Sequence, residues 1–184
     1  MNIRLASISW LFSYPNLKVE SCKVRRGVFM PQIVKGGKYV YGWSKVSNRG
    51  KIVIPNEAKE EYNLTTCNEV ILMPGSKRSG GFSLTTKELL KTARLSVIID
   101  NCLKLAEHQE PEGRAIEING KPYCWVKLNE DGTIIVPLET LKIYGINPGD
   151  LLLSVRGSNV ALGFPARGPI IDEAKKHLDI NLFE

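Results

Sequence analysis

The alternation of hydrophobic and polar residues follows the same course twice along this chain, 82 residues apart. In each copy a polar turn that ends in glycine precedes three aliphatic residues and a proline. These runs are Ile52-Val53-Ile54-Pro55 and Ile134-Ile135-Val136-Pro137. Positions 41–82 and 123–164 share 12 identities in 42 without a gap, where ordinary compositions would share roughly two or three by chance. The chain is therefore a duplicated module.

The polar turns at 47–50 and 129–132 predict a tight reversal in each copy. Asn and Gly supply the unusual backbone angles of such a turn, so each module opens as strand, turn, strand. Glycine closes the turn at the same place in both copies, which predicts a positive φ at Gly50 and Gly132.

A short helix and a hairpin complete each module. Pro55 and Pro137 suit the first turn of a helix, which we expect to run through Tyr62 and Tyr144. The hairpin strands are expected at 69–73 and 81–84 in the first copy, and at 151–155 and 163–164 in the second.

One module of roughly 45 residues cannot bury a full core, and its strand edges would stay open. The two copies of one chain are expected to pair, because a linker of about forty residues raises their effective concentration; pairing between chains is the alternative. Thr86 is a plausible N-cap for a linker helix over 87–108, and a further helix is expected near 170–178. The predicted parts are a basic N-terminal extension (1–32), a first module (33–84), a linker helix (85–113), a second module (114–166) and a C-terminal helix (167–184).

These residues carry a family resemblance. Lys45-Val46 followed by Gly50-Lys51-Ile52-Val53-Ile54-Pro55 and Glu57 resembles the SpoVT/AbrB swapped-hairpin domain, and so does the second copy with its Ile146-Asn147-Pro148-Gly149-Asp150 turn. The two matches cover about half of the chain. In that family two modules interleave their hairpins into one barrel, and the usual activity is DNA binding by transition-state regulators and antitoxins. The resemblance implies a mainly β fold with short helices, in which two modules form an AbrB-like swapped-hairpin barrel with flanking helices.

The resemblance also implies which residues contact double-stranded DNA. Family members place basic residues before the turn, after its glycine and on the short helix. The second copy has Glu130, Asp131 and Thr133 around its turn, where acids repel phosphate. We therefore expect the first module to make most phosphate contacts and shape readout to exceed direct base reading. The candidate DNA-binding residues are Lys45, Arg49, Lys51 and Lys59 in the first module, and Lys127 and Lys142 in the second.

The charge of the chain favours a polyanionic partner. The net charge is +6, and residues 1–52 hold ten basic groups against one acid, while the other 132 residues hold 15 basic and 18 acidic groups. Such asymmetry is typical of polyanion binding, although a merely soluble surface is the simpler alternative. Within the extension, Lys23, Arg25 and Arg26 could form a DNA-reaching arm, an extra strand or a solvated basic face.

Other chemistry has little support in the sequence. The four cysteines are scattered and lack metal-ligand spacing, which predicts no metal site and favours free thiols in a reducing cytoplasm. No nucleophile–base motif or phosphate-binding glycine loop is recognisable, so we expect neither an enzyme nor a cofactor. No apolar run reaches the ~20 residues of a membrane helix. Trp43 and Trp125 are expected to pack in the core rather than stack on bases, because both copies keep them.

The sequence therefore predicts a cytoplasmic DNA-binding transcriptional regulator that assembles as a homodimer of two-module chains. The main alternative is an antitoxin-like or scaffold protein-interaction module that has lost much of its DNA binding. Small-molecule sensing is a third possibility without positive support in the residues.

Overall fold

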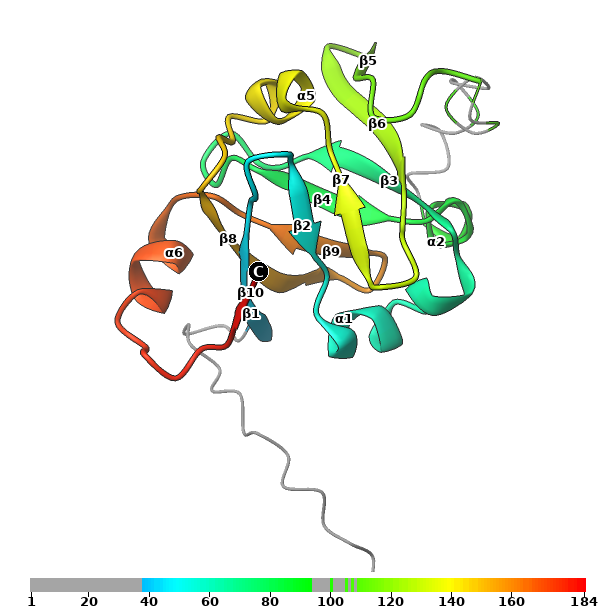
Figure 1. Cartoon of the computed structure of the whole chain (residues 1–184). Coiled ribbons are helices and arrows are strands. Elements are labelled where there is room, and N and C mark those ends of the chain that lie inside the picture. The colour runs from blue at the N-terminus through cyan, green and yellow to red at the C-terminus, as the bar shows by residue number, and fades with distance from the viewer. Residues whose placement is uncertain (1–37, 94–99, 101–104, 106, 108) are drawn as a thin grey trace, which may run out of the picture.

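The computed structural model describes residues 38–93, 100, 105, 107 and 109–184, and there the chain is mainly β with short helices, as expected (Figure 1). The strands are β1 (Val40–Lys45), β2 (Lys51–Val53), β3 (Glu69–Pro74), β4 (Phe82–Thr85), β5 (Ile116–Ile118), β6 (Lys121–Lys127), β7 (Thr133–Ile135), β8 (Leu151–Ser158), β9 (Ala161–Phe164) and β10 (Leu182–Phe183). The helices are α1 (Asn56–Glu61), the 3-10 helix η1 (Leu64–Thr66), α2 (Lys87–Thr92), α5 (Leu138–Ile143) and α6 (Pro169–Ala174).

The strands of the two copies are interleaved. Eight of them form one sheet in the order β10-β1-β8-β9-β4-β3-β6-β5, and β2 pairs with β7 in a separate ribbon. The first strand of the first copy, β1, pairs with β8 of the second copy, and β6 of the second pairs with β3 of the first. The hairpin of each copy therefore pairs with the first strand of the other copy. This exchange covers strand edges that a single module would leave open.

A pseudo-twofold axis relates the copies. Ile52 lies opposite Ile134 in the ribbon, and Phe82 lies opposite Phe164 between β4 and β9. Both pairs join residues that are 82 positions apart. Because an element faces its own counterpart only at a twofold axis, the axis passes through both pairs.

The pairing of β2 with β7 confirms that the two copies of one chain pair with each other. The strands do not, however, close into one hydrogen-bonded barrel. The eight-stranded sheet has two different ends, β10 and β5, and the ribbon forms a second sheet over it. The ribbon is the feature that crosses the front of the molecule in Figure 1.

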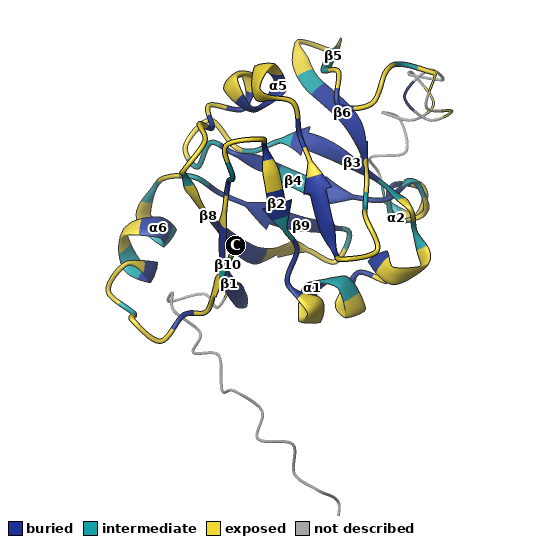
Figure 2. Ribbon diagram, viewed as in Figure 1, coloured by how far each residue is buried: buried dark blue, intermediate teal, exposed yellow. Residues whose placement is uncertain are grey.

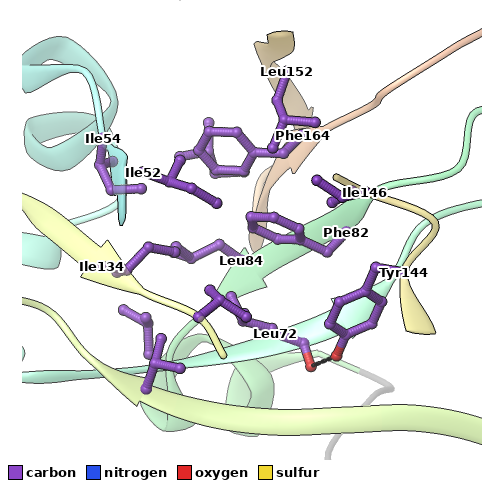
Figure 3. Close-up of a cluster of buried hydrophobic side chains, with 14 of the residues drawn as sticks. Ile52, Ile54, Leu72, Phe82, Leu84, Ile134, Tyr144, Ile146, Leu152 and Phe164 are labelled. Atoms are coloured by element: carbon purple, nitrogen blue, oxygen red, sulfur yellow. Dashed lines mark hydrogen bonds between the residues drawn. The ribbon is translucent and has the colours of Figure 1, made fainter. Parts of the chain in front are cut away.

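The core lies between the ribbon and the larger sheet. Side chains alternate along the ribbon, so that Ile52 and Ile134 are fully buried while Ile135 is 51% exposed. The rings of Phe82 and Phe164 stack below them with centroids 5.0 Å apart. Figure 3 shows these side chains pointing toward one another, and Figure 2 shows how far each residue along the strands that carry them is buried. The hydrophobic runs of both copies therefore form one shared core.

The tryptophans pack in two flanking clusters, as expected. Trp43 is 8% exposed and packs with Leu153 and Ile171, while Trp125 is 7% exposed and packs with Leu90. Neither ring is available as a stacking platform for bases.

The prediction of one helix over 87–108 is wrong. Thr86 does cap a helix, since its hydroxyl accepts a hydrogen bond from the Leu89 N–H at 3.2 Å. The helix ends at Thr92, whose hydroxyl donates to the Leu89 carbonyl, and Ala93 is extended (φ −104°, ψ 163°). A threonine hydroxyl that competes for backbone groups in this way disfavours a continued helix.

The segment 167–184 is also not one helix. After α6 the chain returns as β10, which pairs in parallel with β1. The carbonyl of Asn181 accepts the Trp43 N–H at 2.7 Å, and a Cβ at Gly42 would lie 2.5 Å from the Phe183 ring. β10 thus covers an edge of β1. This pairing could not be predicted from the periodicity of the sequence. The hairpin partner of β6, β5, was likewise not predicted.

We predict that Ile134→Ala lowers the free energy of unfolding by about 2–4 kcal/mol, because it opens a cavity at the axis of the shared core. The matched control is Ile135→Ala, which removes the same atoms from the exposed face of the ribbon and should change stability by less than about 0.5 kcal/mol. Urea unfolding of both variants measures the difference. Equal losses would contradict the assigned faces of the ribbon.

Candidate nucleic-acid interface

The turn of the first copy, residues 47–50, is held by its own side chains. The Ser47 hydroxyl accepts hydrogen bonds from the backbone N–H groups of Arg49 at 3.2 Å and Lys51 at 2.9 Å. Gly50 closes the turn at φ +75°, as predicted, and its carbonyl accepts the Val136 N–H at 3.0 Å. A Cβ on Gly50 would overlap the Val136 carbonyl, so only glycine fits there. The exposed Arg49 side chain is therefore presented by a fixed turn.

The corresponding turn of the second copy, 129–132, is built around Asp131. Its carboxylate accepts hydrogen bonds from the Thr133 hydroxyl at 2.6 Å and the Thr133 N–H at 3.1 Å. The hydrogen bond from the Thr133 hydroxyl, with help from Lys51, lowers the pKa of Asp131. Thr133 is 3% exposed, so it is a buried part of the turn. A lysine at that position would lose the turn hydrogen bonds, which makes Thr133 a poor place to add a DNA contact.

The strand exchange carries each turn to the helix of the other copy. The first turn lies against α5, where a Cβ on Gly50 would lie 3.4 Å from Leu141 Cδ1. The second turn lies against α1, where a Cβ on Gly132 would overlap the Lys59 ammonium. Figure 1 shows the β1–β2 turn beside α5 at the upper edge of the molecule and the β6–β7 turn beside α1 at the lower edge.

Charge is therefore divided between the two ends of the molecule rather than between the two modules. The structure brings Arg49 of the first copy to the helix that carries Lys142 of the second, and both side chains are exposed. It brings Lys59 of the first copy to the turn that carries Glu130 and Asp131. Exchange thus mixes the surfaces of the copies, so each end of the molecule carries side chains from both.

Lys51 and Lys45 both have acidic neighbours. Lys51 Nζ lies 3.5 Å from Asp131 Oδ2, so the second turn partly neutralises a lysine that was assigned to the first. Lys45 Nζ lies 2.8 Å from Glu184 Oε1, next to β10. Both pairs are largely exposed, and such pairs contribute little to stability and exchange readily with solvent ions.

Lys127 lies apart from Arg49 and Lys142. Lys127 is exposed at the end of β6, opposite Glu69 across the strand pair, and its backbone N–H donates to Glu112 Oε1 at 2.9 Å. The extension residues Lys23, Arg25 and Arg26 lie outside the described residues.

Sequence reasoning missed three exposed basic residues, Lys77, Arg78 and Arg167. The first two form a Lys-Arg pair inside the Gly/Ser-rich turn 75–81, and that pair was the available signal. They stand at positions that the family resemblance does not use, and the relation of Arg167 to them depends on tertiary structure.

The lower end of the molecule is held by a partly buried charge cluster. Arg156 binds Glu61 through two nitrogens, at 2.5 and 2.7 Å, and the Tyr41 hydroxyl donates to the same carboxylate at 2.5 Å. Burial alone would raise the pKa of Glu61, but the hydrogen bonds from Arg156 and Tyr41 lower it overall. Burial and the bond to Glu61 raise the pKa of Tyr41. The cluster ties α1 to β1 and to β8 of the other copy.

The described residues contain no group of three or more His, Cys, Asp or Glu side chains that could hold a metal ion. None of their helices is long and apolar enough to cross a membrane.

Comparison with known proteins adds little to this geometry. No protein-family model and no curated protein matches the chain. The solution structure of PHS018 from Pyrococcus horikoshii is 16% identical, covers 71% of this chain and 98% of its own, and superposes with a TM-score of 0.32. A superposition that loose does not establish a common fold.

We predict that Glu61→Gln lowers the free energy of unfolding by about 0.5–1 kcal/mol at pH 7, a value that allows for the partial exposure of the pair. The pKa of Glu61 is lowered by folding, so its contribution is present above the unfolded-state value of about 4.3 and is lost as pH falls through the folded pKa. The difference between wild type and variant should therefore shrink below about pH 4.

Chemical denaturation at pH 7 and pH 3 measures this difference. Glu60→Gln is the matched control, because it removes the same charge from an exposed position on the same helix. A pH-independent loss in Glu61→Gln would show that the carboxylate acts through packing instead of charge.

Proposed function

We propose that this protein is a double-stranded DNA-binding transcriptional regulator whose interleaved halves correspond to the swapped-hairpin arrangement of the SpoVT/AbrB family. The observation that carries the proposal is the reciprocal pairing of β1 with β8 and β6 with β3. The family resemblance implies such interleaving for two modules of this sequence pattern. A fold by itself does not determine function, so the electrostatics of the surface must support the same conclusion.

The distribution of charge supports a local DNA contact. Residues 38–184 hold 19 basic and 18 acidic groups, so five of the six net positive charges of the chain come from residues 1–37. A nearly neutral body binds DNA through a local concentration of cations rather than through overall attraction. Arg49 and Lys142 provide such a concentration, because exchange places cations of both copies at one end.

Binding through this end depends mainly on phosphate contacts. Arg49 stands on a short, fixed turn and Lys142 on a short helix, and neither element has the length of a recognition helix for the major groove. Positioning on the backbone and sequence-dependent DNA shape are then the main sources of specificity. Lys51 takes part when phosphate replaces Asp131 as its partner.

We further propose that two chains associate into a homodimer, which sets two such ends on one duplex. Symmetric dimers commonly bind half-sites about one helical turn apart. Exposed aliphatic side chains on the ribbon and α5 support association through a nearby face. These are Ile135 (51% exposed), Leu138 (40%) and Ile143 (56%).

The same aliphatic side chains favour the second candidate function, an antitoxin-like or scaffold module that binds a protein. Aliphatic residues exposed close together mark interaction surfaces more often than single ones do. A protein that forms dimers but binds no duplex DNA would support this second function.

The DNA-binding prediction is tested with the full chain and a random-sequence duplex, titrated at two salt concentrations. Arg49→Ala with Lys51→Ala should weaken binding to all sequences and lower the slope of log affinity against log salt by about one per lost phosphate contact. Unchanged affinity in this variant would show that the assigned surface is wrong.

Asp131→Asn is the opposite test. Asparagine keeps the side-chain oxygen that caps the turn, while it removes the charge that neutralises Lys51. We expect tighter DNA binding by this variant, with a steeper salt dependence. Weaker binding without loss of stability would contradict a role of Lys51 in DNA contact.

Sedimentation equilibrium tests the proposed assembly. The chain has a mass of 20.5 kDa, and we expect a species of twice that mass. A monomer that binds DNA tightly at moderate salt would contradict the homodimer.

A further inference from the structure

We propose that Lys77, Arg78 and Arg167 belong to the same DNA-binding surface as Arg49 and Lys142, and that the protein engages the phosphate backbone of a duplex with this one end only. The proposal rests on the DNA-binding function proposed above and names further residues of its site. The surface consists of residues 47–50, 75–81, 138–143 and 165–168, and is called the basic end.

A continuous series of backbone hydrogen bonds joins the four segments of the basic end. Val136, just before α5, donates to the carbonyl of Gly50 at 3.0 Å. Gly81 donates to the carbonyl of Tyr144, just after α5, at 3.2 Å. The carbonyl of Ser79 accepts hydrogen bonds from the backbone N–H groups of Ala166 at 3.1 Å and Arg167 at 3.0 Å. The segments come from both copies, and the strand exchange assembles them.

Hydrogen bonds within the turn 75–81 hold the backbone that carries Lys77 and Arg78. The hydroxyls of Ser76 and Ser79 lie 2.7 Å apart, and the Ser76 carbonyl accepts the N–H groups of Ser79 and Gly80. The Arg167 guanidinium donates to the Lys77 carbonyl at 3.3 Å. Arg167 thus packs beneath the turn that carries Lys77 and Arg78, so that all three cations belong to one small structure.

The basic end carries five basic residues against one acid, Glu139. The side chains of the five are exposed, and within residues 38–93 and 109–184 no ion pair joins any of them to a carboxylate. Exposed cations that carboxylates do not neutralise attract the phosphate backbone of nucleic acids without sequence preference. The five basic residues are Arg49, Lys77, Arg78, Lys142 and Arg167.

The pseudo-symmetric segments at the other end have the opposite charge. At an offset of 82 residues these are 129–132, 157–163, 56–61 and 83–86, and together they hold five acids and one basic residue. Two of the five acids form ion pairs, Glu61 with Arg156 and Asp131 with Lys51. Tyr62 joins two of them, because its hydroxyl donates to the carbonyls of Ser158 and Ala161 at 2.7 and 3.0 Å. This acidic end repels phosphate, which orients the protein with the basic end toward DNA.

The repeat itself provides the test substitution. Lys77 and Arg78 correspond to Asn159 and Val160 in the second copy, where the shorter turn between β8 and β9 carries neutral residues. Lys77→Asn with Arg78→Val should lower the salt slope of duplex binding by about two and weaken affinity by roughly tenfold or more at 0.1 M salt. The full chain and a random-sequence duplex are used, and thermal unfolding checks the fold.

Lys87→Ala with Lys91→Ala is the matched control. It removes two positive charges from α2, which begins after the far end of β4 from the turn 75–81. We expect this control to change the slope by less than half as much. An equal effect would show that total charge, and no defined end, determines binding.

Asn159→Lys with Val160→Arg places the same two cations at the acidic end, and we expect little gain in affinity. A gain as large as the loss in the first variant would overturn one-ended binding. If the wild type binds and the Arg49/Lys51 variant is weakened while Lys77→Asn with Arg78→Val is unchanged, this inference fails and the proposed function stands. A wild type that binds no duplex at low salt would overturn both.

Discussion

The contact between each copy and its own counterpart at the pseudo-twofold axis is the constraint on which the structure depends. Ile52 meets Ile134 in the ribbon and Phe82 meets Phe164 in the sheet, so two layers of the core are crossed by one axis. Each pair buries apolar surface that a single module would leave in water. With these pairs in contact, β1 and β6 each pair with a hairpin of the other copy. The exchange of strands and the contacts on the axis therefore form together.

The arrangement of charge follows from the same exchange. A turn and a helix that are close in the sequence, such as 47–50 and α1, lie at opposite ends of the ribbon, and each is completed by the other copy. Arg49 thereby reaches α5, while Lys59 reaches the turn of Asp131. At the lower end, the hydrogen bonds of Glu61 to Arg156 and Tyr41 fix α1 against strands of both copies. The charges at each end therefore depend on the packing of the two copies, because each end combines residues from both.

The sequence was informative wherever a feature depends on neighbours along the chain. Gly50 and Gly132 have the predicted positive φ, and the short helices and the first hairpin lie within a residue or two of their expected positions. In the second hairpin the strands are longer than expected, since β8 continues to Ser158 and β9 begins at Ala161. Features that depend on another segment could not be found in this way. The Lys51–Asp131 pair, the packing of Arg167 under Lys77 and the strand β10 each join parts that are distant in sequence. For the candidate interface, the sequence alone singled out Arg49 and Lys142 by residue type, while their neighbours from other segments became apparent only in the structure.

The fusion of both copies into one chain has a consequence for how such a surface can change. In a symmetric assembly of two identical modules, any substitution appears at both ends at once, and every gain at one end is repeated at the other. Here Arg49 and Asp131 occupy equivalent positions with opposite charges, and so do Lys142 and Glu60. Two separately encoded copies allow each end to vary independently while the residues on the axis stay alike. The duplicated chain therefore keeps the core contacts of a symmetric dimer, while the surface charges at its two ends can differ.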